Sequence, residues 1–85
     1  NPTHFAVALK YERGDNAPLC VAKGLDTIAL KIREVAEKNN VPVIENPPLA
    51  RALHAACEPG DLIPPAHYQA VAEIISYVLR LGQRP

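Results

Sequence analysis

Four consecutive residues could break their own backbone: Asn1, Pro2, Thr3 and His4. An asparagine is normally attacked by the backbone nitrogen of the next residue, but Pro2 has no N–H, so that route is closed. The alternative is attack by the Asn1 side-chain nitrogen on its own carbonyl carbon, which forms a succinimide and expels the Pro2 nitrogen. The pair therefore indicates self-cleavage of the chain between Asn1 and Pro2.

This reaction needs help from its neighbours, because an amide nitrogen is a poor nucleophile that requires a base and a held geometry. A histidine can carry a proton near neutral pH, so His4 is the candidate base, and Thr3 adds a hydroxyl within reach of a tight turn. The same residues are also typical of an inert turn, since the residue before a proline is restricted to extended backbone. Both interpretations stay open on these four residues alone.

Composition narrows the classes of function. The chain has 85 residues, which predicts one small domain, and its 48% apolar content supports a globular fold. Nine acidic and nine basic residues balance, which argues against a nucleic-acid partner and against an electrostatic membrane anchor. No apolar run approaches the roughly 20 residues of a membrane span, and no signal-peptide pattern is present.

The cysteines and histidines show no ligand-like spacing, so we expect no metal and no cofactor. Cys20 and Cys57 lie far apart in the sequence and in apolar surroundings. Reduced, partly buried thiols are the favoured interpretation, and a disulfide is the alternative. We assign no ligand-like spacing to His4, His54 and His67 with these cysteines.

Alternating apolar residues predict a strand over residues 5–11. One face is heavily apolar, and the other carries the small Ala6 and Ala8, so its neighbour on that face must pack closely. Residues 12–18 have turn chemistry, and residues 19–23 form a second short strand that completes a hairpin. Gly24 is expected to end that strand.

A helix follows, with Asp26 as its expected N-cap and Asn39-Asn40 as its stop signal. Val41 to Glu45 is predicted to be a third strand, with Pro42 restricting it to an edge or a strand start. A strand–helix–strand crossover makes a parallel pair, so the expected sheet is mixed.

Two more helices are predicted, one opening at Pro47-Pro48 and ending at Glu58, the other running from Pro65 to Gly82. The fold class is therefore α/β (α+β), a small mixed sheet surrounded by helices. We expect an extended segment upstream of Asn1 to complete this sheet. Arg51 and His54, on the first of these helices, face solvent or contact a partner.

Several stretches in order resemble the export-switch family of type III secretion, FlhB/YscU/SpaS. The resemblance covers essentially all 85 residues, and the flagellar branch is more similar than the injectisome branch. The tetrad alone is short, but the tetrad followed by Ala-Lys-Gly and Pro-Leu-Ala-Arg is specific. The matching stretches are Asn1–His4, Val21–Gly24 with Asp26, Ile32–Glu34, Val41-Pro42, Glu45-Asn46, Pro48–Leu53, Ile63-Pro64, Tyr68 and Ala70–Glu73.

This resemblance implies a function that composition does not reveal. Residues 1–85 would be the cytoplasmic domain of a bacterial inner-membrane protein whose transmembrane region lies upstream. The domain would cut itself once between Asn1 and Pro2, as an asparagine peptide lyase without external substrate. Asn1 would supply the attacking amide and Pro2 the leaving group, while Thr3 and His4 shape the turn.

Cleavage would switch export from rod and hook substrates to filament substrates. The implied partners are the upstream fragment of the same protein, an export-gate membrane protein, a ruler protein for hook or needle length, and export substrates with their chaperones.

Two alternatives accompany this interpretation: an injectisome homologue that switches from needle to translocator or effector export, and a non-cleaving docking module. A hydrolase acting on other chains is poorly supported, because no Ser-His-Asp, Cys-His or paired-carboxylate arrangement is visible. For Arg51 we expect a solvated surface position, with a partner contact or an intra-domain salt bridge as the alternatives.

Overall fold

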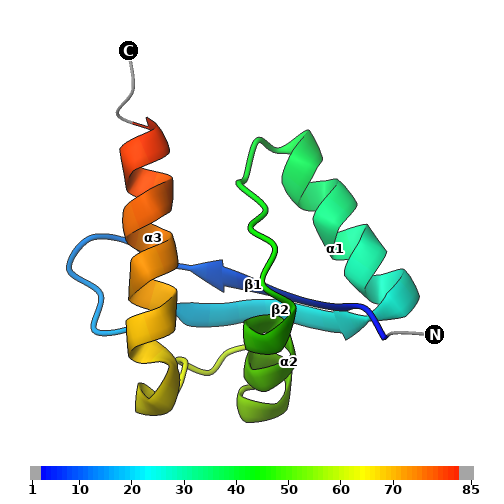
Figure 1. Cartoon of the computed structure of the whole chain (residues 1–85), viewed down its shortest axis with the longest axis horizontal. Helices are drawn as coiled ribbons and strands as arrows, with labels where there is room; N and C mark the ends of the chain where they lie inside the picture. Colours follow the sequence, from blue (N-terminus) through cyan, green and yellow to red (C-terminus); the bar gives the residue numbers. More distant parts are fainter. Residues whose placement is uncertain (1–2, 83–85) are drawn as a thin grey trace.

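An antiparallel hairpin forms the centre of the computed structural model, which describes residues 3–82 (Figure 1). Helix α1 (Asp26–Lys38) follows the hairpin, and α2 (Pro47–Ala56) and α3 (Tyr68–Gly82) pack beside it, which confirms the α+β class. Among residues 3–82, no helix has the length and apolar character that crossing a membrane requires. The elements are β1 (Phe5–Lys10), β2 (Leu19–Leu25), α1 (Asp26–Lys38), α2 (Pro47–Ala56), a 3-10 turn (Pro65–His67) and α3 (Tyr68–Gly82).

The ladder between the strands runs from Phe5 opposite Leu25 to Lys10 opposite Leu19, with an irregularity between Ala8 and Leu9. Its end nearest the hairpin loop is extended by residues 60–63. The Cys20 N–H donates to the Asp61 carbonyl at 2.8 Å, and the Ile63 N–H donates to the Pro18 carbonyl at 2.9 Å. The outer edge of β2 is therefore partly paired.

One face of the hairpin carries the small residues Ala6, Ala8 and Gly24, and α1 packs there. The sequence predicts a close neighbour on this face. Ala6 lies opposite Gly24 in the ladder, so β2 continues through this glycine to Leu25. The expectation that Gly24 ends the strand was wrong. Glycine at this position instead leaves room for the close approach of α1. A Cβ atom added to Gly24 would clash with the Ile28 side chain of α1.

The core lies on the other face of the hairpin, between the strands, α2 and the start of α3. Val7 and Leu9 pack against it from β1. Both cysteines are free and buried within it, at 0% exposure for Cys20 and 3% for Cys57. Burial, and the neighbouring Cys57 thiol, raise the pKa of Cys20. The buried residues of this cluster are Ala17, Cys20, Leu53, Cys57, Ile63 and Val71.

The third strand predicted at Val41 to Glu45 does not form. Among residues 3–82 the sheet has two strands, antiparallel rather than mixed, and residues 41–46 are an extended connection from α1 to α2. Two contacts with α1 hold this connection. The Val41 N–H donates to the Ala36 carbonyl at 2.9 Å, and Arg33 forms an ion pair with Glu45 at 2.7 Å. Pattern alone cannot make a strand where no neighbouring strand lies in register.

The apolar side chains of α3 are only partly buried. Val71 is 2% exposed and Ile75 packs against the core, but Tyr77 and Leu79 are about half exposed at 46% and 51%. The helix runs across the strands rather than along them, so its second half extends away from the hairpin (Figure 1). Helix α3 spans Tyr68–Gly82, and Gly82 is the last residue that the structure describes.

We predict that Gly24→Ala lowers the free energy of unfolding by about 1–3 kcal/mol, the usual cost of overpacking a close contact. The cause is the clash with Ile28, which can be relieved only by moving α1 off the hairpin. Urea unfolding of the two proteins measures the difference. Gly82→Ala is the matched control, because an added Cβ meets nothing within 4 Å there. Equal stability of the Gly24→Ala protein and the unaltered protein would contradict this role.

Candidate functional site

The candidate site is the start of β1. Thr3 and His4 are exposed and lie immediately before the first strand residue, Phe5. The predicted reacting residues Asn1 and Pro2 lie outside the described residues, so their catalytic assignment stays a prediction. What the structure does describe is how the chain is held immediately after the predicted cut.

His4 is bound by Asp26, which lies 22 residues further along the chain. The His4 N–H donates to the Asp26 Oδ1 atom at 2.9 Å, and the Asp26 N–H donates to the His4 carbonyl at 2.8 Å. Asp26 is the first residue of α1 and has a positive φ of 45°. The predicted N-cap role was wrong: Leu25 occupies the cap position, and its side chain makes no cap hydrogen bond.

Phe5, the first residue of β1, is contacted by two side chains of α2. The Phe5 ring meets the His54 ring edge-on, with 5.3 Å between centroids, and the Arg51 guanidinium lies 4.9 Å from the Phe5 ring centre. Such a cation–π contact contributes about 0.5–1 kcal/mol at an exposed site. Arg51 is thus exposed but not simply solvated, since it makes an intra-domain contact with an aromatic ring rather than the salt bridge considered from the sequence.

Lys23 fastens the C-terminal end of α2 to β2. Its Nζ donates to the His54 carbonyl at 2.8 Å and forms an ion pair with Glu58. The Lys23 side chain is only 18% exposed. A charged hydrogen bond shielded from water in this way is worth more than an exposed ion pair.

A second Asn-Pro pair, Asn46-Pro47, provides an internal comparison. Its asparagine is the N-cap of α2, and the side-chain oxygen accepts the Leu49 N–H at 3.3 Å. This side chain is engaged with the helix end instead of folding back onto its own carbonyl. The same dipeptide is therefore a structural cap in one place and a candidate cleavage site in another.

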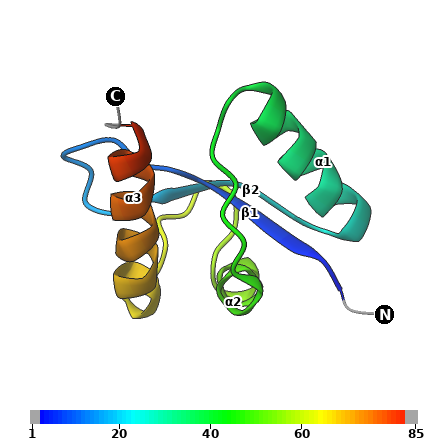
Figure 2. The same ribbon diagram turned by 45° about the horizontal axis from the view of Figure 1, so that its top comes forward.

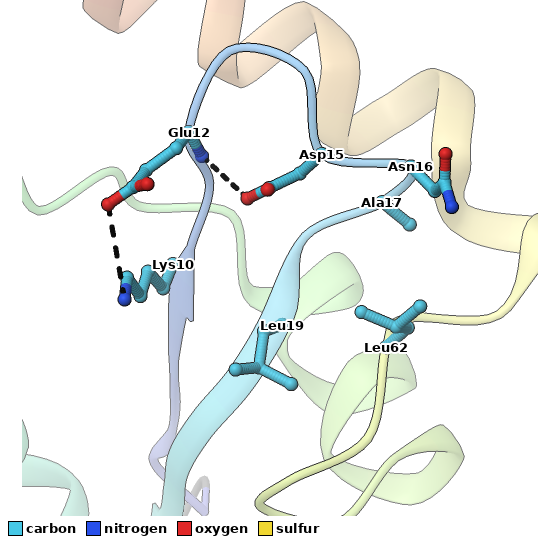
Figure 3. A pocket seen from close by; sticks show the side chains of 7 residues that line it. All are labelled: Lys10, Glu12, Asp15, Asn16, Ala17, Leu19 and Leu62. Atoms are coloured by element: carbon cyan, nitrogen blue, oxygen red, sulfur yellow. Dashed lines mark hydrogen bonds and ion pairs between the residues drawn. The ribbon is translucent and has the colours of Figure 1, made fainter.

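Two hollows lie elsewhere on the molecule. One is at the hairpin loop, far along the strands from His4, where Lys10 pairs with Glu12 and Asp15 accepts the Glu12 N–H (Figure 3). The other is an apolar groove between α1 and the hairpin, with Val21, Ile28 and Val35 among its lining residues. Within residues 3–82, no three His, Cys, Asp or Glu side chains gather as a metal ion would require.

A model of the FlhB HrpN YscU SpaS family matches residues 1–78, a span that includes the whole tetrad. The chain belongs to this family. Flagellar biosynthetic protein FlhB of Aquifex aeolicus is 58% identical over 80 residues, which are 93% of this chain and 23% of that protein. FlhB of Escherichia coli is 50% identical over 93 positions, which are 100% of this chain and 24% of that protein. The chain thus spans about a quarter of the length of these FlhB proteins.

Solved structures of FlhB-family domains have the same fold. The C-terminal domain of PscU matches with a TM-score of 0.85 and 38% identity, covering 91% of this chain and 99% of that one. The cytoplasmic domain of FlhB from Shewanella putrefaciens matches with a TM-score of 0.85 and 43% identity, covering 89% of this chain and 64% of that one.

Sequence reasoning missed two residues that organise this FlhB-family site. Asp26 was assigned to its own helix, although its partner is His4. Lys23 was recognised only as part of a motif, although it joins β2 to α2. A lysine inside an otherwise apolar strand was the available signal, because such a charge is buried only when it has a partner.

We predict that Lys23→Met lowers the free energy of unfolding by about 1.5–3 kcal/mol, the range for hydrogen bonds to charged groups. Methionine keeps the length of the side chain but leaves the His54 carbonyl and Glu58 without their partner. Urea unfolding provides the measurement.

Lys31→Met is the matched control for this substitution. Lys31 pairs with Glu34 at 3.8 Å across an exposed helix surface. Its replacement should change stability by less than about 0.5 kcal/mol. Equal effects of the two substitutions would show that Lys23 is no more than a surface charge.

Proposed function

We propose that this chain is the cytoplasmic domain of a bacterial inner-membrane protein of the flagellar type III export apparatus, and that it cuts itself between Asn1 and Pro2. The observation that carries the proposal is the anchoring of His4 by Asp26 at the start of β1. In the sequence, the Asn1-Pro2 pair comes just before this hydrogen-bonded strand, which supports the proposal. The match of the family model from residue 1 supports it as well.

The proposed chemistry is a single intramolecular turnover. The Asn1 Nδ2 atom forms a bond to the Asn1 carbonyl carbon, and the bond from that carbon to the Pro2 nitrogen breaks. The proton lost by the amide passes to a base, and the Pro2 nitrogen gains a proton as it leaves. Water then opens the succinimide to a C-terminal asparagine. His4 is the proposed proton acceptor, and Thr3 supports the turn.

The upstream fragment is the first proposed partner, and the sheet offers it a place. Among residues 3–82 the outer edge of β1 has no strand beside it, whereas the β2 edge is partly paired. An unpaired edge readily accepts another strand. Residues 41–46 pass across the hairpin in both views, with Val41 and Val43 exposed (Figures 1 and 2). An upstream strand on β1 would cover them and hold Asn1 in place.

The proposed consequence of the cut is a change of export specificity from rod and hook substrates to filament substrates. The FlhB names of the curated relatives support the flagellar assignment over an injectisome homologue. The further proposed partners are an export-gate membrane protein, a hook-length ruler protein, and export substrates with their chaperones.

A non-cleaving docking module is the second candidate function. The observation that favours it is the exposed apolar second half of α3, where Tyr77 and Leu79 are 46% and 51% exposed. In that case the Asn1-Pro2 pair would be an ordinary turn, and switching would not depend on cleavage.

We predict that the full-length protein yields two fragments and that Asn1→Ala abolishes the cut, because alanine has no side-chain nitrogen to attack the carbonyl. Intact mass under denaturing conditions is the measurement. One fragment should begin at Pro2, and the other should end in asparagine or its succinimide. A Pro2 terminus in the Asn1→Ala protein would contradict the cyclisation mechanism.

Asn46→Ala is the matched control, since it removes the asparagine of the second Asn-Pro pair. It should cost about 1 kcal/mol of stability through loss of the α2 cap. It should leave the two fragments unchanged, because the Asn46 side chain is engaged with Leu49. A single uncut mass from folded, unaltered protein would favour the docking module.

A further inference from the structure

The contact between His4 and Asp26 continues the strand ladder in an unusual way. Phe5 and Leu25 are the last paired residues of the hairpin, so His4 and Asp26 are the next pair outward. The Asp26 N–H donates to the His4 carbonyl, as in a normal antiparallel pair. The return bond differs, because the His4 N–H donates to the Asp26 carboxylate and not to its backbone carbonyl.

The carboxylate takes the place of the backbone carbonyl because Asp26 is the first residue of α1. The backbone carbonyl of a helical residue points along the helix axis, so it cannot also face the neighbouring strand. The short carboxylate therefore replaces it as the acceptor for His4. Without it, the ladder would end at Phe5, and the His4 amide would lose this partner.

The backbone of Asp26 is adapted to this task. Its φ of 45° lies in the left-handed region, which only glycine, asparagine and aspartate adopt readily. The cap position of its helix is Leu25, whereas the Asp26 carboxylate accepts the His4 N–H. Backbone strain of this kind persists where the surroundings hold it, and it is common beside functional sites.

We propose that Asp26 is a positioning residue for the Asn1–Pro2 cleavage, acting through its carboxylate on the His4 amide. This inference rests on the proposed self-cleavage. With both backbone groups of His4 engaged, the direction in which the chain leaves β1 is set at that residue. The reacting bond lies only two residues further upstream. Loss of the His4 amide bond would let that bond sample unproductive geometries.

The test is the rate at which the full-length protein cuts itself after synthesis in a cell-free translation mixture, followed by gel separation of the fragments. Asp26→Gly removes the acceptor while relieving the left-handed backbone. We expect cleavage slowed by about 10–100-fold, the scale of a small misplacement of reacting groups. Asp26→Asn keeps a side-chain oxygen for His4, so it should retain most of the rate.

Two competing roles of Asp26 predict different results. If it served only folding, Asp26→Gly would cleave at the unaltered rate as long as it folds. If its negative charge at the α1 N-terminus were what matters, Asp26→Asn would be as slow as Asp26→Gly. Either result would overturn the inference. If Asp26→Gly fails to fold, Asp26→Asn carries the test, since asparagine also adopts the left-handed region and a slow Asp26→Asn protein overturns the inference.

Hydrogen exchange of the His4 amide is the readout independent of cleavage. It should be slow in the unaltered and Asp26→Asn proteins and fast in Asp26→Gly. Equally fast exchange in all three would overturn the inference. Asp15→Gly is the matched control, because Asp15 accepts the Glu12 N–H at the opposite end of the hairpin. It should leave cleavage and His4 exchange unchanged.

The cleavage experiment distinguishes a failure of the positioning role of Asp26 from a failure of the proposed self-cleavage. An unaltered protein that never cleaves overturns both. An unaltered protein that cleaves at the same rate as a folded Asp26→Gly protein overturns only the role of Asp26.

Discussion

The antiparallel pairing of β1 and β2 is the constraint on which the rest of this structure depends. A two-stranded ribbon is at best marginally stable alone, so both of its faces must be covered. Its small-residue face accepts α1, with Gly24 against Ile28. Its other face, with Val7 and Leu9, closes the core with α2 and the start of α3. The same register places His4 opposite Asp26, so the pairing that builds the core also holds the candidate site.

Helix α2 connects this core to the start of β1. Lys23 holds its C-terminal end through the His54 carbonyl, while His54 and Arg51 pack on Phe5. These contacts differ from the pairs along α1, such as Lys38 with Glu34, which are exposed and contribute little. The stabilising polar contacts are therefore concentrated where α2 meets the hairpin, around Lys23 and Phe5.

The two outer edges of the hairpin differ in their hydrogen bonding. Residues 60–63 hydrogen-bond to β2 around Cys20, whereas no strand among residues 3–82 lies beside the edge of β1 that faces away from β2. Val41 and Val43 lie exposed in the nearby connection, although their pattern is that of a strand. An open strand edge is what an additional strand would occupy, and this supports an upstream fragment as partner.

Local pattern was sufficient for much of this protein. Alternation along β1, the helical stripe and asparagine stop of α1, and the prolines opening α2 predicted these elements near their observed bounds, because each depends on neighbouring residues. The tetrad was likewise identified as a candidate site from residue types alone. What local pattern could not decide depends on residues distant in sequence. Gly24 belongs to a strand because Ala6 pairs with it, and residues 41–45 stay unpaired because no strand lies in register. Asp26 binds His4 rather than its own helix, because only the folded hairpin brings together groups separated by 22 residues.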